Sequence, residues 1–137
     1  MHYKDSKGKL HALDSAEFEY LLPAGSVAIT DEEAAAITAA QNAPTPEQIQ
    51  AAFVSAIQAR LDSFARQRGY DDILSACTYA TSTITKFKNE GQTCVNLRDA
   101  TWEAAYNILG AVQTGAIPMP SSIADIEADL PTLAWPA

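Results

Sequence analysis

Apolar side chains recur every three or four residues through the second half of the chain, which is the spacing of a helix with one buried face. The first such stripe is formed by Ile49, Phe53, Ile57, Leu61 and Phe64. Its start is marked by Thr45, which can cap a helix, and by Pro46, which suits the first helical position. Gly69 is typical of a helix end. The pattern therefore predicts a helix that begins at Pro46 and ends before Gly69.

A second stripe predicts a long helix from about residue 86 to about residue 114. It comprises Phe87, Cys94, Leu97 or Arg98, Trp102, Ala105, Leu109 and Val112. Gly91 and Gly110 lie inside this helix, where a glycine lowers stability by about 1 kcal/mol relative to alanine. We expect both glycines to mark places where another helix packs closely. Gly115 and the prolines that follow it end the helix.

Shorter helices are expected between and after these two. The segment "YDDILSACTYA" predicts a helix capped by Asp71 or Asp72, and the β-branched run "TSTIT" separates it from the long helix. A last short helix is expected over "SIADIEADL", capped by Ser121 or Ser122. Together these elements predict a small antiparallel helical bundle.

The N-terminal residues have the pattern of a β-hairpin. In "HYKDSKGKLHAL", Tyr3 and Lys4 lead into the turn formed by residues 5–8, and residues 9–13 return. Asp favours the start of such a turn, and Gly8 can adopt the positive φ that its exit requires. The hairpin is followed by one or two helical turns over "DSAEFEYLL", with Asp14 or Ser15 as the cap, and by a strand over "GSVAIT". Thr30 and Glu33 then predict a capping box for a helix over "DEEAAAITAA".

The composition changes at "QNAPTPEQ", a polar run with two prolines that reads as a linker over residues 41–48. We therefore predict an α+β chain. It has a small N-terminal β-hairpin and strand module over residues 1–43. A mainly α-helical bundle with an extended C-terminal tail follows over residues 44–137. The N-terminal module is too small for a large core, so we expect it to lean on a partner, on another copy in a homo-oligomer, or on the second half.

Charge and cysteine content remove several function classes. The net charge of −8 disfavours nucleic-acid binding, and no apolar run is long enough to predict a membrane span. The opening residues lack the pattern of a secretory signal. Cys77 and Cys94 fall in expected helices and are interpreted as reduced, buried thiols rather than a disulfide. Their spacing to His2 and His11 does not match a zinc site, so we predict no metal and no cofactor.

No catalytic constellation is visible. The chain has no G-x-S-x-G, H-E-x-x-H, Walker or G-x-G-x-x-G motif. The two histidines lie in the expected hairpin, where they could be cross-strand neighbours. We interpret them as solvent-exposed, because no acidic or nucleophilic partner has a defined spacing to them. The acidic residues 31–33 suit the first turn of a helix, and those at 125, 127 and 129 suit a solvated helix face. We therefore predict that the protein is not an enzyme.

Two segments could form a partner surface. In "RDATWEAAYNIL", Trp102, Tyr106 and Leu109 share one helical face, and Arg98 could stack on Trp102 or pair with an acidic neighbour. This face is either part of the core, which is the commoner role of such a stripe, or a site where a partner binds. The tail "LPTLAWPA" must be extended because of its prolines, and it docks either on its own bundle or on a partner. The candidate partner-binding residues are Tyr3, Leu10, Arg98, Trp102, Tyr106, Leu133 and Trp135.

Four pieces of the chain, in this order, resemble phage tail-fibre assembly proteins: the opening "MHYKDSKGKLHALDS", the helix start "TDEEAAAI", the linker "PTPEQIQAA", and Trp135-Pro136 near the end. The region between the last two pieces departs from that family. It lacks the Asp-Trp-Thr segment and has a longer helix, and it resembles helical segments of prophage tail-region proteins.

The resemblance implies an assembly chaperone without catalytic residues. Such a protein binds the phage tail-fibre protein in the host cytoplasm and aids its folding and trimerisation, and it is either released or retained on the fibre tip. The alternative is a structural virion component of the tail fibre or baseplate.

Overall fold

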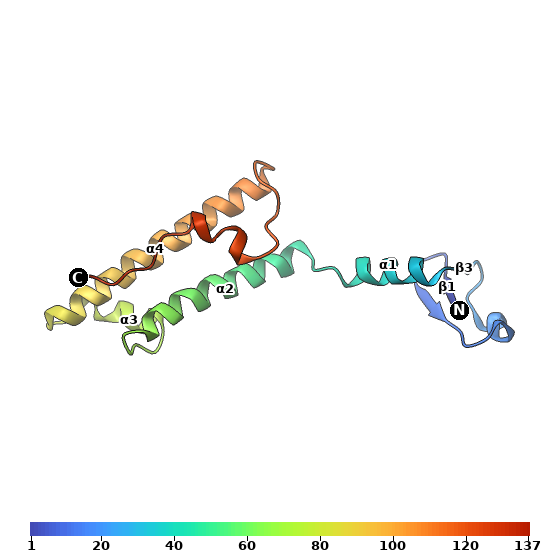
Figure 1. Cartoon of the computed structure of the whole chain (residues 1–137), viewed down its shortest axis with the longest axis horizontal. Helices are drawn as coiled ribbons and strands as arrows, with labels where there is room; N and C mark the ends of the chain where they lie inside the picture. Colours follow the sequence, from blue (N-terminus) through green and yellow to red (C-terminus); the bar gives the residue numbers. More distant parts are fainter. The chain divides into compact units, whose positions relative to one another are not determined.

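The computed structural model describes all 137 residues and confirms the α+β fold class. The chain divides into two compact units, Met1–Thr45 and Pro46–Ala137 (Figure 1). The division falls inside the proline-containing segment 41–48. None of the helices combines the length and the apolar character needed to cross a membrane.

The N-terminal unit contains a three-stranded antiparallel sheet with the order β2-β1-β3. The strands are β1 (His2–Lys4), β2 (Leu10–Ala12) and β3 (Val27–Ile29). The central residue of β1, Tyr3, is paired with His11 on one side and with Ala28 on the other. The predicted hairpin and the predicted third strand are both confirmed.

The hairpin turn is held by the side chain of Asp5. Its Oδ1 accepts hydrogen bonds from the backbone N–H groups of Lys7 and Lys9, both at 2.9 Å. Gly8 has a φ of +83°, a conformation that residues with a Cβ rarely adopt, and its N–H donates to the carbonyl of Asp5. The turn chemistry expected from the sequence is therefore present.

Two helical segments complete the N-terminal unit. The 3₁₀ helix η1 (Ala16–Leu21) is capped by Ser15, which accepts from the N–H of Glu17. Helix α1 (Asp31–Asn42) begins with the predicted capping box: the N–H of Glu33 donates to Thr30 Oγ1 at 3.1 Å, and the N–H of Thr30 donates to Glu33 Oε2 at 2.8 Å. Both helix starts are where local sequence signals placed them.

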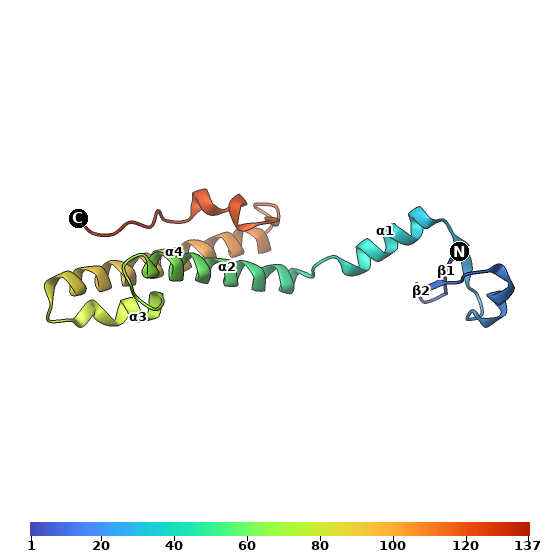
Figure 2. The same cartoon turned by 60° about the horizontal axis from the view of Figure 1, so that its bottom comes forward.

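The second unit is built on two long helices, α2 (Pro46–Arg66) and α4 (Thr85–Gln113). Between them lie α3 (Ile73–Thr78), whose N-cap Asp72 accepts from the N–H of Ser75 at 2.7 Å, and the 3₁₀ helix η2 (Tyr79–Thr81). Figures 1 and 2 show α3 at one end of the pair of long helices. The predicted bounds of both long helices are confirmed. Helix α2 begins at Pro46 and ends before Gly69, and α4 begins and ends within one residue of the predicted positions.

The core of this unit sits toward the end that carries α3. Its buried residues are Ile57, Leu61, Phe64, Ala65, Tyr70, Ile73, Ala76, Cys94 and Leu130. The second half of the α2 stripe is thus buried, whereas Ile49 and Phe53, in the first half, are only half-buried. Both cysteines are free thiols; Cys94 is buried as expected, whereas Cys77 is only half-buried.

The two glycines of α4 differ in what surrounds them. A Cβ on Gly91 would lie 2.3 Å from the backbone nitrogen of Ala80 and 2.5 Å from the carbonyl carbon of Tyr79, so α4 meets η2 at backbone distance there. A Cβ on Gly110 would meet nothing within 4 Å. The expectation of close packing is therefore confirmed at Gly91 and wrong at Gly110, where a Cβ would face open space.

The segment after the prolines is not the single short helix that the sequence suggested. It forms two 3₁₀ turns, η3 (Ile123–Asp125) and η4 (Glu127–Asp129). The Asp125 carboxylate accepts bonds from both preceding serines, 121 and 122, and Ile126 is buried below the turns.

Candidate functional site

The C-terminal tail lies extended on its own helices. The Trp135 ring stacks on Phe64, with centroids 4.2 Å apart and planes 13° from parallel, and it lies 6.2 Å from the Tyr70 ring. The indole N–H donates to Gln67 Oε1 at 3.2 Å. The two views in Figures 1 and 2 both place the tail along the bundle. Of the two open interpretations of the tail, docking on its own bundle is the one that the structure shows.

Two arginines, Arg60 in α2 and Arg68 just after it, contact the docked tail. Arg68 places its guanidinium carbon 5.2 Å from the centroid of Trp135, and its Nη1 lies 3.5 Å from Oε2 of Glu90, a carboxylate that is only 3 % exposed. Arg60 donates from Nη2 to the carbonyl of Pro131 at 2.8 Å. Leu133 is half-buried against the same core. Trp135 and Leu133, two of the residues expected at a partner surface, are therefore engaged within the chain.

The two hairpin candidates differ. Tyr3 is 4 % exposed, and its hydroxyl donates to Glu19 Oε1 at 2.5 Å. This bond, together with burial, raises the pKa of Tyr3 above the usual value for tyrosine. Leu10 is half-buried and lines a shallow hollow beside α1. Tyr3 belongs to the interior of the N-terminal unit, and only Leu10 borders open space.

The two histidines are not cross-strand neighbours, because His11 lies opposite Tyr3. Each instead contacts a carboxylate: His11 Nε2 lies 3.0 Å from Asp5 Oδ2, and His2 Nδ1 lies 2.8 Å from Asp31 Oδ1. The hydrogen bond from His11, followed by the backbone bonds of the turn, lowers the pKa of Asp5. The interpretation of both histidines as solvent-exposed residues without an acidic partner is wrong, since each is partly buried beside a carboxylate. The pair of His11 and Asp5 lies within the hairpin, and the pair of His2 and Asp31 connects β1 to the start of α1.

The face with Trp102 and Tyr106 is divided between core and surface. Trp102 is half-buried and packs against the core, whereas Tyr106 is 68 % exposed. Arg98 does not stack on Trp102, since its Nη2 lies 3.3 Å from Asp99 Oδ1. This face therefore forms one wall of an open site.

That site is an apolar groove of about 310 Å³ between the first half of α2 and the second half of α4. We call it the α2–α4 groove. Its apolar lining comes from both helices and from the loop after α4: Phe53, Val54, Ile57, Trp102, Ala105, Tyr106, Ile108, Leu109, Val112, Met119, Pro120 and Ile126.

The groove exists because the tail and α3 cover only one end of the two long helices. Beyond the core, Phe53 of α2 and Leu109 of α4 both line the groove and are only half-buried. Val54 and Met119 are roughly half-exposed at its edges. An apolar opening of this size between two helices is a typical place for a ligand or partner segment to bind.

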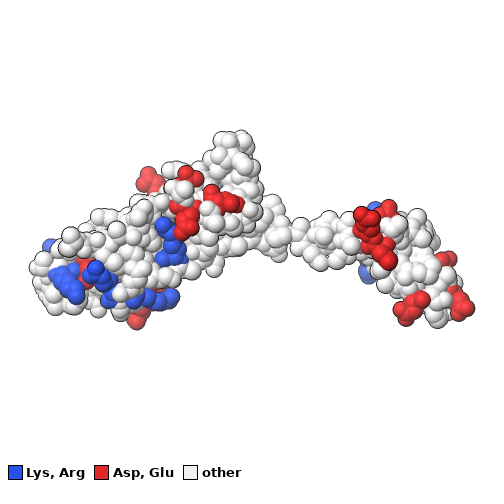
Figure 3. All heavy atoms as spheres, viewed as in Figure 1, with Lys and Arg blue, Asp and Glu red and all other residues white.

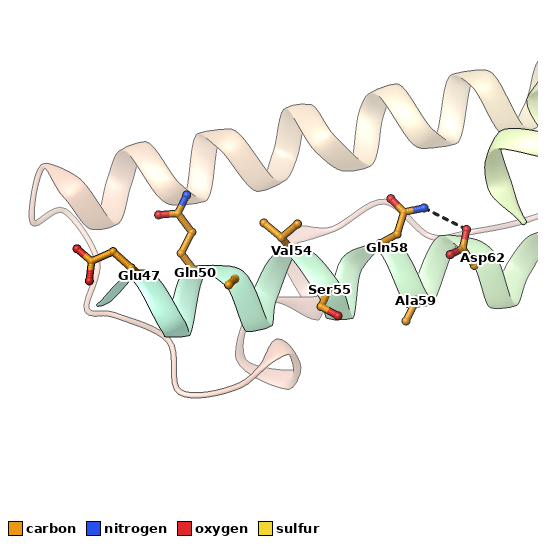
Figure 4. Close-up of a pocket in the computed structure, with 8 residues that line it drawn as sticks. Glu47, Gln50, Val54, Ser55, Gln58, Ala59 and Asp62 are labelled. Carbon is orange, nitrogen blue, oxygen red and sulfur yellow. Dashed lines mark hydrogen bonds between the residues drawn. The ribbon is translucent and has the colours of Figure 1, made fainter. Parts of the chain in front are cut away.

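The edge of the groove on α2 continues into a shallow polar shelf. Figure 4 shows Gln50, Val54 and Gln58 following one another along this helix, with Glu47 near its start. At the far end of the shelf, the Asp62 carboxylate accepts from the Gln58 amide at 3.1 Å and from the backbone N–H at the start of α3 at 3.0 Å. Glu47, Gln50 and Val54 belong to both the shelf and the groove.

Polar groups buried in the second unit lie in the core and not in the groove. They include Glu90, Thr101 and the Tyr70 hydroxyl, whose pKa is raised by burial and by nearby Glu90. Burial also raises the pKa of Cys94 to about 11, so that its thiol is a poor nucleophile. No three His, Cys, Asp or Glu side chains come together in a way that could hold a metal ion. The feature of this unit that is best suited to binding is therefore the apolar lining of the groove.

Sequence reasoning found one wall of the groove, through Trp102 and Tyr106, and missed the other. The signal for the second wall was the length of the α2 stripe. It extends back to Ile49, farther than the short helix and the tail could cover. Comparisons with family models, with curated proteins and with solved structures found no match for this chain.

Proposed function

We propose that the protein is a non-enzymatic binding protein that assists the assembly of a phage tail fibre, and that it holds a segment of the fibre protein in the α2–α4 groove. The observation that carries the binding role is the open apolar groove, whose two helical walls are fixed at one end by a packed core and a docked tail. The tail-fibre role is supported by the resemblance of four ordered sequence pieces.

A fibre subunit presents a physical problem that such a groove can relieve. Trimeric, β-rich fibres form many contacts between distant residues, so they fold slowly and expose apolar segments and strand edges meanwhile. A helper that covers one apolar segment reduces aggregation until the trimer forms. The net charge of −8 would keep the complex soluble while the segment is held.

Co-expression with the tail-fibre protein of the same genome tests the proposal. The yield of soluble, trimeric fibre should fall several-fold when this chain is omitted, and purified fibre subunits should co-elute with it before trimerisation. Unchanged fibre solubility and trimer yield in its absence would contradict the chaperone role.

A structural role in the virion is the second candidate, and a feature of the N-terminal unit favours it. The 3₁₀ helix η1 exposes Phe18, Tyr20 and Leu21, and strand β3 exposes Val27. These side chains offer a second apolar surface, on the other unit, through which the protein could stay attached. Mass spectrometry of purified particles separates the two roles: a stoichiometric amount in virions indicates a structural component, and absence indicates a released chaperone.

A further inference from the structure

We infer that the occupant of the α2–α4 groove is an amphipathic helix of the partner, about three turns long, with lysine or arginine along its polar flanks. This inference rests on the proposed function only in taking the groove as the place where a partner segment binds. Three properties of the groove carry it: its length, the state of its backbone groups and its charge.

The length follows from the lining residues. On α2 they extend from Pro46 to Ile57, and on α4 from Trp102 to Gln113. At 1.5 Å per residue, each wall is about 17 Å long, which matches about three turns of a helix laid alongside. Apolar side chains of the occupant at spacings of three and four residues would then meet Phe53 and Leu109 along the groove floor.

The backbone of the walls favours a helix over an extended segment. Both walls are α-helices, whose N–H and C=O groups are already paired within the helix. The lining offers few polar side chains, namely Glu47, Gln50 and Gln113, besides the Tyr106 hydroxyl and the Trp102 indole N–H. An extended segment would leave its own backbone groups without partners in an apolar site, whereas a helix pairs them internally.

The charge around the groove selects a basic occupant. Neither residues 46–59 nor residues 99–137 contain a single Lys or Arg, although both stretches contain carboxylates. Glu47 lines the groove, and Glu103 is exposed on α4 beside the lining residue Trp102, although it is not itself part of the lining. On the face seen in Figure 3, the acidic side chains of this unit gather over the η3–η4 segment, and most of the basic ones gather toward the α3 end.

A second copy of this chain does not match these requirements through its accessible helix. Helix α1 begins with three acidic residues and contains no Lys or Arg. Acidic flanks would repel the groove edges, so the expected occupant belongs to a different protein.

The test uses the full-length chain and a fluorescein-labelled peptide of about 14 residues, built only of leucine and lysine in a helical amphipathic pattern. A peptide with glutamate in place of lysine is the matched control. Anisotropy titration should show the lysine peptide binding at least about tenfold more tightly than the glutamate peptide. Its affinity should fall as salt rises from about 50 to about 500 mM. Circular dichroism should show the peptide helical when bound.

Variants locate the binding. Val54→Lys places a cation in the groove and should weaken lysine-peptide binding by about tenfold or more. Leu74→Lys is the control, because Leu74 is 63 % exposed on α3, outside the groove, and undergoes the same change. Glu103→Lys should also weaken binding, whereas Asp71→Lys, at the other end of the unit, should have little effect.

Equal binding of the two peptides, or equal effects of Val54→Lys and Leu74→Lys, would overturn the inference. So would a dimer in sedimentation analysis that Val54→Lys converts to monomer, because a second copy would then occupy the groove. If fibre yield depends on this chain but not on Val54, the inference fails together with the groove as the place of binding, and only the role in fibre assembly stands. If the peptide binds as expected but fibre yield does not depend on the chain, the proposed function fails and the groove chemistry stands.

Discussion

Replacing Trp135 by alanine should destabilise the helical unit, although the residue lies in a tail without regular secondary structure. The substitution removes the stacked contact with Phe64, the cation–π contact with Arg68 and the hydrogen bond to Gln67. A stacked aromatic pair contributes about 1 kcal/mol beyond its buried area, and a partly exposed cation–π contact about 0.5 to 1 kcal/mol. Apolar burial of a half-covered indole adds about 1 to 2 kcal/mol.

These contributions sum to about 2.5 to 4 kcal/mol, but part of the loss is recovered. The released tail regains backbone freedom, at about 1 kcal/mol for each residue that becomes mobile. We therefore expect the free energy of unfolding to fall by about 2 kcal/mol, and the melting temperature of a unit of this size to fall by about 10 °C. Deleting residues 131–137 should cost more, because it also removes Leu133 and the acceptor of Arg60.

Urea unfolding followed by far-ultraviolet circular dichroism measures the change, and the fluorescence of the remaining Trp102 reports on the helical unit specifically. Trp135→Phe keeps a ring over Phe64 and should recover most of the stability. Tyr106→Ala is the matched control, since this ring is mostly exposed and its loss should change stability by less than about 0.5 kcal/mol. If Trp135→Ala proves as mild as Tyr106→Ala, then Trp135 does not dock the tail on the helices.

Further predictions concern glycine packing, pH and thiol reactivity. Gly91→Ala should destabilise the protein by about 1 to 3 kcal/mol in thermal melts, because the new Cβ meets backbone atoms of η2. Gly110→Ala should instead stabilise it by about 0.5 to 1 kcal/mol, because alanine favours a helix more than glycine does. Equal effects of the two substitutions would contradict the close packing at Gly91. The pKa of Asp5 is lowered in the folded state, so its contribution is present above the unfolded pKa near 3.8 and is lost as pH falls through the lower folded value. Amide NMR signals of the hairpin should disperse less below about pH 4, and Asp5→Asn should flatten that dependence; an unchanged profile would refute it. With a pKa of about 11, Cys94 should resist thiol reagents at pH 8 until the protein unfolds, and modification faster than unfolding would contradict its burial.

Features governed by neighbours in the sequence were predictable here. The hairpin turn, the capping box at Thr30, the start of α2 at Pro46 and the N-cap at Asp72 each depend on side chains a few residues apart. The long helices were visible because their apolar stripes persist over many turns.

Features governed by distant residues were not predictable. The contact of His2 with Asp31 joins positions 29 residues apart, and the docking of Trp135 on Phe64 depends on where α2 ends relative to the tail. The groove has the same origin. Other elements cover an apolar stripe only as far as they extend along the helix. The periodicity of the stripe does not predict which part of it they leave uncovered.

The docked tail also bears on how this unit forms during synthesis. Arg60 and Pro131 are 71 residues apart in sequence, and Gln67 and Trp135 are 68 apart, although each pair is joined by a hydrogen bond. Closing a loop of that length costs about 4 kcal/mol of chain entropy. The apolar side of Phe64 therefore stays open on the ribosome until residue 135 has left the exit tunnel. A nascent chain of this protein should remain susceptible to protease in α2 until Trp135 emerges, and become resistant only then.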